Sequence, residues 1–325
     1  VESEKVGIHY TIFELIHNIK REIEQYNTGR DENTPPIYVS DRRWKKIVGL
    51  LRTSAYLNES PGIHFSDCLL MSACLWDEIS QLPIIEEIVE QSIARGINTY
   101  LLGEKRLEQK LDTLLKNVYF ITGTAYAGKS TMVRLLAEKY DGICCGENYH
   151  DALMGLIDRE HQPNLSYFET MSGWQEFIGR TPEEYDAWIT GCSEEAAGLE
   201  LLQLIRLSAG EKKIFADTNI LLSVLREIGD YHRVAVLLSP QSMSVERFFD
   251  REDTEKQFLY RQIQQAPDPV QAMENYKNCL AKINSPAHYR EYEESGFYTC
   301  LRREDSTIPE VLEKLERHFQ LRQAG

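Results

Sequence analysis

Over roughly the first hundred residues, apolar positions recur with the spacing of amphipathic helices. Polar, turn-forming stretches at Asn27 to Pro36 and Ser54 to Gly62 separate these helices. Later helices are expected to start at Ser40, at Ser66 and at Pro83, because Ser is a good N-cap residue and Pro suits the first turn. The first helix is marked by Tyr10, Phe13, Leu15, Ile16, Ile19 and Ile23. The sequence therefore predicts a helical bundle at this end of the chain.

From about Gly103 the pattern changes to short apolar runs between helical stretches. A charged helix, Glu104 to Lys116, leads into Val118 to Thr122, whose β-branched and aromatic residues are typical of a buried strand. Similar runs follow at Ile143 to Cys145, Lys213 to Ala216, Val234 to Leu238 and Phe297 to Leu301. Such alternation predicts an α/β fold with a five-stranded parallel sheet. We expect two domains, residues 1–103 and 104–325, joined within Gly96 to Lys105.

One octapeptide after the first predicted strand carries a specific phosphate-binding pattern. Gly123-Thr124-Ala125-Tyr126-Ala127-Gly128-Lys129-Ser130 fits G-x-x-x-x-G-K-[ST], and an amphipathic helix continues from Thr131. The glycines permit a tight loop whose backbone N–H groups face phosphates, and a helix N-terminus adds partial positive charge. Lys129 supplies a cation to the β- and γ-phosphates, and Ser130 a hydroxyl to Mg²⁺. The pattern predicts that Gly123 to Thr131 bind ATP or GTP, with Mg²⁺.

A carboxylate near the metal is expected at Asp217. This residue ends the apolar run Lys213 to Ala216, where a Walker-B-like aspartate is found, and Thr218-Asn219 are expected to start the next helix. Asp217 would order Mg²⁺ through water or accept a proton from a substrate hydroxyl, and the sequence does not separate these roles. A simple helix cap is a further interpretation of Asp217.

Two more polar segments are candidates for the reacting groups. Arg247 and Arg251 are four residues apart, so a helix would place them on one face, where they could stabilise charge on a transferring phosphate. Acidic neighbours make a salt-laced surface helix an equal interpretation. After the second predicted strand, Glu147, His150 and Asp151 form a candidate acceptor pocket, with capping residues in a loop as the alternative. The aromatic residues between Tyr167 and Trp188 are expected to be core.

Composition limits the classes of partner. The chain carries 51 acidic against 36 basic residues and a net charge of -15, which disfavours extensive binding to nucleic acid but not to a small nucleotide. Its 7 cysteines fit no zinc or CxxC spacing and indicate reduced thiols in a cytoplasm. No apolar run approaches a membrane span, so we expect a soluble cytoplasmic protein. A first residue of Val is compatible with a fragment or a processed chain.

Three polar-apolar motifs stand out in the N-terminal helices. They are Val39-Ser40-Asp41-Arg42-Arg43-Trp44-Lys45-Lys46, Leu51-Arg52-Thr53-Ser54-Ala55 and Asp67-Cys68-Leu69-Leu70 to Cys74-Leu75-Trp76. With these motifs, about residues 8–96 resemble the helical lid of MoxR-type AAA+ ATPases, the RavA branch especially. The resemblance implies that Arg42 or Arg43 takes the place of the sensor-2 arginine that reaches the nucleotide. In that family the ATPase core precedes the lid.

Residues 117–325 resemble, in the order of their motifs, the nucleotide-kinase-like branch of P-loop proteins. The order is phosphate loop, acceptor loop, strand-end aspartate, arginine-bearing lid and a terminal helix led by Ser or Thr. The resemblance implies ATP and Mg²⁺ as donor, with Lys129, Ser130, Asp217, Arg247 and Arg251 in the roles given above. The acceptor loop lacks the arginines with which nucleoside-monophosphate and shikimate kinases hold an anion.

Two functional hypotheses follow. The first is a kinase that moves the γ-phosphoryl of ATP to an unidentified small-molecule acceptor. The second is a MoxR-like AAA+ ATPase fragment or a nucleotide-gated interaction module, whose helical bundle docks a protein partner. A kinase would release ADP in proportion to an added acceptor, whereas a motor would hydrolyse ATP alone.

Overall fold

A five-stranded parallel sheet forms the centre of the α/β part, in the strand order β2-β3-β1-β4-β5. The computed structural model describes residues 2–31, 34–101, 114–157, 159–250, 254–303 and 305–321. The strands are β1 (Val118–Gly123), β2 (Ile143–Cys145), β3 (Ile214–Asp217), β4 (Val234–Leu238) and β5 (Tyr298–Leu301). All of them coincide with the predicted apolar runs within a residue, so the predicted parallel sheet is confirmed.

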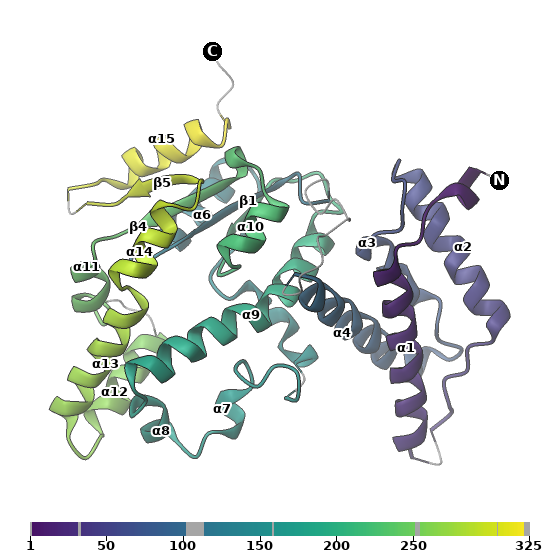
Figure 1. Ribbon diagram of the computed structural model, residues 1–325, viewed down its shortest axis with the longest axis horizontal. Helices are drawn as coiled ribbons and strands as arrows, with labels where there is room; N and C mark the ends of the chain where they lie inside the picture. Colours follow the sequence, from purple (N-terminus) through teal and green to yellow (C-terminus); the bar gives the residue numbers. More distant parts are fainter. Residues whose placement is uncertain are drawn as a thin grey trace.

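Helices cover both faces of the sheet and build the N-terminal part (Figure 1). The α-helices are α1 (Tyr10–Gly29), α2 (Asp41–Leu57), α3 (Phe65–Cys68), α4 (Leu82–Leu101), α6 (Lys129–Lys139), α7 (Tyr167–Thr170), α8 (Trp174–Ile178), α9 (Pro182–Leu207), α10 (Leu222–Ile228), α11 (Gln241–Glu246), α12 (Thr254–Gln264), α13 (Pro269–Ile283), α14 (Pro286–Glu293) and α15 (Ile308–His318). Short 3₁₀ helices are η1 (Glu2–Lys5), η2 (Leu69–Ala73), η3 (Ile79–Gln81), η4 (Tyr149–Leu156) and η5 (Tyr231–Arg233).

Alternate side chains of the strands enter two different hydrophobic clusters. On one face, Ile121 and Phe215 pack with α6 and α15, for example with Leu136 and Leu315. On the other face, Phe120 and its neighbours pack with α9 and α10. Because successive side chains of a strand point to opposite sides, this division is what a sheet buried between two helical layers requires.

Most of the helices predicted in the N-terminal part are present in the structure. Ser40 caps α2 by accepting from the backbone N–H of Arg43 at 3.3 Å, as its residue type predicts. The helix predicted to run onward from Ser66 is wrong, since α3 is a single turn followed by η2. The buried carboxylate of Asp67 explains this start, because it accepts from Ser54 Oγ at 2.6 Å and from the N–H of His64 at 2.9 Å.

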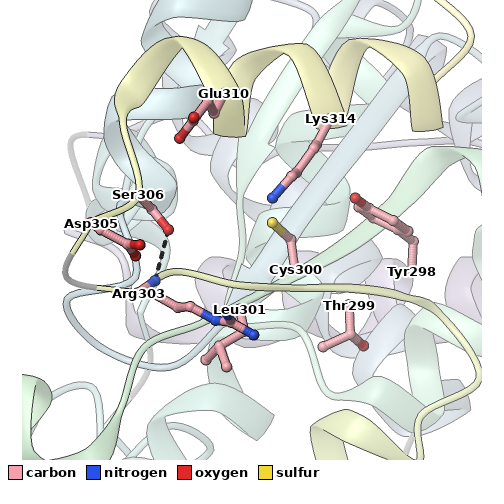
Figure 2. Close-up of a pocket in the computed structure, with 9 residues that line it drawn as sticks. All are labelled: Tyr298, Thr299, Cys300, Leu301, Arg303, Asp305, Ser306, Glu310 and Lys314. Carbon is pink, nitrogen blue, oxygen red and sulfur yellow. Dashed lines mark hydrogen bonds between the residues drawn. The ribbon is translucent and has the colours of Figure 1, made fainter.

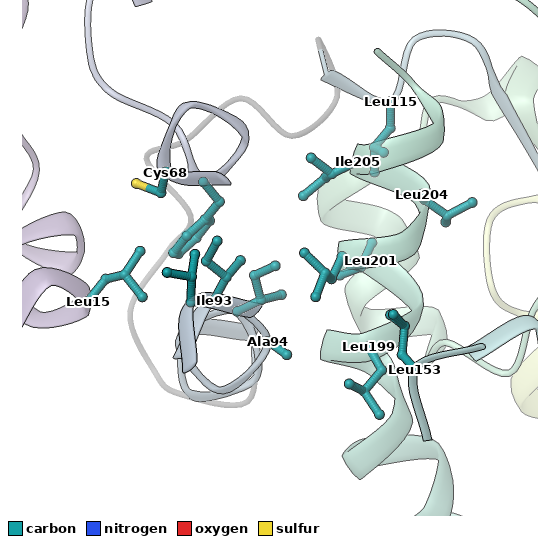
Figure 3. Packing of buried hydrophobic residues seen from close by; sticks show 14 of the residues in the cluster. Leu15, Cys68, Ile93, Ala94, Leu115, Leu153, Leu199, Leu201, Leu204 and Ile205 are labelled. Atoms are coloured by element: carbon teal, nitrogen blue, oxygen red, sulfur yellow. The ribbon is translucent and has the colours of Figure 1, made fainter. Parts of the chain in front are cut away.

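Two long helices, α4 of the N-terminal part and α9 of the α/β part, lie side by side (Figure 1). Ile93 and Ala94 of α4 face the leucines of α9, including Leu201, within one hydrophobic cluster (Figure 3). Gly198 allows the close approach, since a Cβ there would stand 2.4 Å from the carbonyl oxygen of Ala94. The Asn98 side chain also donates to the carbonyl of Glu195 at 3.0 Å. The helical part and the sheet therefore share one continuous core.

The predicted joint between two domains begins within a helix. Residues Gly96 to Leu101 form the end of α4. The remainder of the predicted joint and most of the charged helix expected from Glu104 to Lys116 lie outside the described residues. The boundary between residues 1–103 and 104–325 stays a prediction.

The aromatic segment forms a packed cluster, as predicted, although Phe168 is 44% exposed. Tyr167, Phe177 and Trp188 pack together. Trp174 contacts the ring of Phe258 in α12, and Tyr185 contacts that of Tyr276 in α13. The guanidinium of Arg180 lies 3.9 Å from the centroid of the Tyr167 ring. All 7 cysteines are free thiols. Among the helices that the structure describes, none is both long and apolar enough to cross a membrane.

Candidate phosphate-binding site

The glycine-rich octapeptide lies between a strand and a helix, as its pattern predicts. It leaves the end of β1 at Gly123 and enters α6 at Lys129. The pairing of β1 with β4 continues one residue into the loop, because the N–H of Thr124 donates to Leu237 O at 3.0 Å. The N–H of Ser239 then donates to Thr124 Oγ1 at 2.9 Å. The sheet therefore fixes the first half of the loop.

Both glycines of the loop have a backbone conformation that other residues rarely adopt. Gly123 has φ 128°, and a Cβ there would stand 1.9 Å from Leu237 O. Gly128, the N-cap of α6, has φ 91°. Apart from the chain neighbours of Gly128, the one described atom within 4 Å of the point where a Cβ on Gly128 would stand is Arg302 Nη1, at 3.7 Å. That side of Gly128, at the N-terminus of α6, is where an anion would bind.

Three reactive groups meet at the carboxyl ends of β1 and β3. Ser130 Oγ donates to Asp217 Oδ2 at 2.6 Å, and Lys129 Nζ lies 3.9 Å from Asp217 Oδ1. Lys129 Nζ also donates to Thr124 O at 3.4 Å. The sequence predicted each of these residues separately. Their proximity follows from the parallel pairing of β1 with β3, which places Ile121 beside Asp217.

Asp217 is almost fully buried, with 2% of its surface exposed. Burial raises its pKa above the ordinary value, and the charge of Glu147 raises it further, while Lys129 and the hydroxyl of Ser130 lower it. The helix-cap interpretation of Asp217 is wrong, because the next helix begins only at Leu222 and Thr218-Asn219 do not start it. Asp217 is thus held at the strand end, next to the loop.

Ser130 and Asp217 fit a hard divalent cation through their oxygens. Within the described part of the chain, no three His, Cys, Asp or Glu side chains gather as a metal site. Mg²⁺ would suit this donor set, since it commonly takes one or two protein oxygens and completes its shell with phosphate oxygens and water. The residues present are therefore compatible with Mg²⁺ carried by a nucleotide.

The predicted acceptor residues do not share one environment. His150, in η4, is 6% exposed, and its Nδ1 lies 3.3 Å from Glu200 Oε1. Glu147 is exposed and influences the pKa of Asp217. Asp151 is exposed on η4. Of the predicted acceptor set, the structure brings Glu147 toward Asp217 and turns His150 into the interior.

The interior around His150 is a polar cluster that the sequence analysis did not find. Glu200 of α9 is 1% exposed, and its Oε2 accepts from Thr218 Oγ1 at 2.6 Å. Burial and the charge of Glu200 raise the pKa of Tyr149 well above its ordinary value. Among the described residues, the buried atoms His150 Nδ1 and Glu200 Oε1 make no hydrogen bond, although they lie 3.3 Å apart. A carboxylate within the apolar run from Ala196 to Ile205 was the signal available in the sequence.

The predicted arginine-bearing helix is interrupted. Helix α11 ends at Glu246, Arg247 is its C-cap with φ -100°, and the chain turns before α12 begins at Thr254. The helix predicted around Arg247 is therefore not continuous beyond Glu246. Arg251 itself lies outside the described residues. Arg247 is exposed.

Ser239, directly after β4, and Ser244 of α11 donate hydrogen bonds to the middle of the loop. The carbonyl oxygen of Ala125 accepts from Ser239 Oγ at 2.7 Å and from Ser244 Oγ at 2.8 Å. Both serines are fully buried. One peptide group of the loop is thereby joined to the end of β4 and to α11.

An arginine that follows the edge strand β5 also contacts the loop. Arg302, directly after β5, donates from Nη1 to Tyr126 O at 2.8 Å. Its neighbour Arg303 instead lines a cavity of about 560 Å³ between β5 and α15, where its N–H donates to Ser306 Oγ (Figure 2). The other lining residues include Cys300 and Lys314, and none belongs to the octapeptide.

The sensor-2 arginines expected from the lid resemblance have local contacts. Arg43 pairs with Asp77 at 2.6 Å and donates to Trp76 O at 2.7 Å, so it ties α2 to the turn after η2. Arg42 is exposed at the start of α2. A nucleotide-reading role for either residue is not supported by these contacts.

Comparison with known families adds one finding about the N-terminal helices. The family model of the AAA lid domain matches residues 11–89, which run from α1 into α4. The match supports the resemblance of these helices to an AAA+ lid, and it does not specify the MoxR branch. No solved structure matches the chain. The resemblance of residues 117–325 to nucleotide kinases has no support from these comparisons.

Proposed function

We propose that this protein binds Mg·ATP at the loop from Gly123 to Ser130 and catalyses transfer of its γ-phosphoryl group. The observation that carries the proposal is the cluster of Lys129, Ser130 and Asp217, in which Ser130 Oγ lies 2.6 Å from Asp217 Oδ2. A cation, a hydroxyl and a buried carboxylate beside a helix N-terminus are the groups that phosphoryl transfer uses. The AAA lid match supports an ATPase-related protein in general.

Each residue of the cluster has a role in this proposal. Lys129 neutralises charge on the β- and γ-phosphates, and the N–H groups at the start of α6 bind the same oxygens. Ser130 and Asp217 would hold Mg²⁺, which when bound supplies positive charge at the phosphates. Asp217 either orders the metal through water or takes the proton of the attacking hydroxyl.

Water is one acceptor for the phosphoryl group. In this form the protein is an AAA+-related ATPase or a nucleotide-gated interaction module, and the match of residues 11–89 to the AAA lid domain favours it. Helix α4 contacts η4 and α9, so a rearrangement beside Asp217 has a packed route to the helical part. A protein partner would then bind the helical part.

A small molecule is the other acceptor. The nucleotide-kinase-like order of motifs favours this form, and Glu147 lies close enough to Asp217 to raise its pKa. A carboxylate at that position would bind a hydroxyl or an amine of the acceptor. Because His150 is buried against Glu200, the pocket for such an acceptor would be built on Glu147 rather than on the whole predicted set.

ADP release from the complete chain tests the proposal and separates its two forms. The protein is incubated with Mg·ATP alone and with a panel of small alcohols and amines, with Lys129→Ala as the blank. Release without acceptor identifies an ATPase, and release in proportion to one acceptor identifies a kinase. Ligand at about 100 times Kd should also stabilise the fold by about 2.7 kcal/mol. A chain that neither releases ADP nor gains thermal stability with Mg·ATP contradicts the proposal.

A further inference from the structure

Arg302 is a cation that none of the roles above uses, although it contacts the candidate phosphate loop. Its backbone N–H donates to Leu238 O at 2.7 Å, which continues the pairing of β5 with β4 one residue beyond the strand. This bond fixes the direction in which the side chain leaves the sheet. The guanidinium then reaches past the end of β4 to the loop that follows β1.

The guanidinium of Arg302 lies beside the part of the loop where helix α6 begins. Nη1 donates to Tyr126 O at 2.8 Å, and the guanidinium carbon is 5.4 Å from the centroid of the Tyr126 ring. The same Nη1 is 3.7 Å from the point where a Cβ on Gly128 would stand. Apart from the chain neighbours of Gly128, Arg302 is therefore the described residue that comes nearest to this side of the glycine.

Within the part of the chain that the structure describes, the charge of Arg302 lacks a carboxylate counter-ion. An arginine carries five N–H donors, and the bond to Tyr126 O uses one of them. No carboxylate among the described residues forms an ion pair with Arg302, in a chain that has 51 acidic residues. A half-buried guanidinium without a carboxylate partner, next to a helix N-terminus, is suited to a bound anion.

We propose that Arg302 binds the phosphate groups of the nucleotide, as a second cation across the loop from Lys129. The inference rests on the proposed function, since it assigns a further contact within the same site. It also provides, from the turn after β5, the arginine that the sequence pattern had sought at Arg247 and Arg251. The hydrogen bond to Tyr126 O holds the guanidinium in place before the nucleotide arrives, which reduces the entropic cost of binding.

Calorimetric binding to the complete chain tests this inference with three probes: inorganic tripolyphosphate, Mg·ATP and adenosine. Arg302→Ala should weaken tripolyphosphate and Mg·ATP by about 10- to 100-fold, as expected for the loss of a hydrogen bond between charged groups. Adenosine should bind both proteins alike. Arg303→Ala is the matched control, because it removes the same charge one residue away on the side of the outer cavity, and it should bind all three probes like the parent chain.

Arg302→Gln separates phosphate binding from support of the loop. Glutamine keeps a polar side chain with N–H donors but is shorter than arginine and carries no charge, so this variant should lose tripolyphosphate affinity. Its melting temperature, compared with that of the parent chain, measures how much the bond to Tyr126 O supports the loop. Tripolyphosphate affinity that is unchanged in Arg302→Gln would overturn the inference, and so would a loss confined to adenosine, which would mark a contact to the base. If the parent chain binds neither tripolyphosphate nor Mg·ATP, the proposed function fails first.

Discussion

The first glycine of the phosphate loop, Gly123, has no room for a side chain, because the backbone of Leu237 lies against it. At Gly123, φ is 128° and the carbonyl oxygen of Leu237 occupies the place that a Cβ would take. Gly146, after β2, has no atom within 4 Å of its Cβ position in the described part of the chain. The two positions can therefore be compared, since a contact requires glycine at position 123 and no such contact requires it at position 146.

Gly123→Ala should destabilise the protein by about 3 kcal/mol or more, because the methyl group forces β1 away from β4 or strains φ. Gly146→Ala should change stability by less than about 1 kcal/mol. Urea denaturation of both variants measures the difference. Equal stabilities of the two variants would contradict the contact between Gly123 and Leu237.

Asp217→Asn should lower Mg·ATP turnover by about 100-fold or more, because it removes the carboxylate that serves as metal ligand or base. Burial raises the pKa of Asp217, so at neutral pH the ionised carboxylate costs the folded state free energy. Without nucleotide, Asp217→Asn should therefore melt above the parent chain at neutral pH.

The sign of this stability effect gives its pH dependence. A raised pKa in the folded state means that the parent chain recovers stability as the pH falls toward the ordinary aspartate value of about 3.9. The difference in melting temperature should disappear in that range. An Asn variant that is less stable than the parent chain at neutral pH would show that the bonds to Ser130 and Lys129 outweigh burial.

Among the described glycines outside the loop, Gly198, where α9 crosses α4, leaves the least room between a hypothetical Cβ and the backbone of another element. A Cβ on Gly198 would stand 2.4 Å from Ala94 O and 2.6 Å from Asn98 Oδ1. Gly49, in α2, is exposed and has no such neighbour among the described residues. Both glycines lie inside helices, so their alanine variants share the same gain in helix propensity.

Gly198→Ala should lower the free energy of unfolding by about 1–3 kcal/mol, because the added methyl group separates α4 from α9. Gly49→Ala should raise it by about 0.5–1 kcal/mol, since alanine favours the helix over glycine. Chemical denaturation followed by circular dichroism compares the two. A stabilising Gly198→Ala would mean that the helices cross with more space than the structure shows.

Elements with one local signal were predictable from the sequence, and contacts between distant elements were not. The strands follow from short β-branched runs, and α6 follows from the phosphate-binding pattern that precedes it. The break after Glu246 lies in a polar segment whose spacing is also compatible with a helix. The burial of His150 depends on Glu200, a partner on another helix. Arg302 reaches Tyr126 only because β5 and β1 flank the same strand, and sequence separation hides that.

At the scale of the whole molecule, residues 1–103 and 104–325 share one hydrophobic cluster. The apolar residues of α9, among them Leu201 and Ile205, face α4 (Figure 3). An ion pair between Arg206 and Glu90 lies at the same interface. The predicted division into two domains is therefore not a division into two independent cores.

Deletion of residues 1–103 should expose the apolar face of α9, so the remaining chain should bind a hydrophobic dye and melt at a lower temperature than the complete protein. Differential scanning calorimetry of the complete chain should show a single transition for the same reason. Two separate transitions, or a truncated chain as stable as the parent, would contradict the shared core.

The carbonyl of Ala125 has a mechanical consequence. Ser239 and Ser244 both donate to this single oxygen, so the orientation of its peptide plane decides whether the phosphate loop is hydrogen-bonded to α11. Rotation of that plane would release both hydroxyls in one event rather than in two steps. A ligand that turns this peptide plane would therefore break the hydrogen bond between the loop and α11, the helix that leads to Arg247. The bonds to both serines would form again together when the plane turns back.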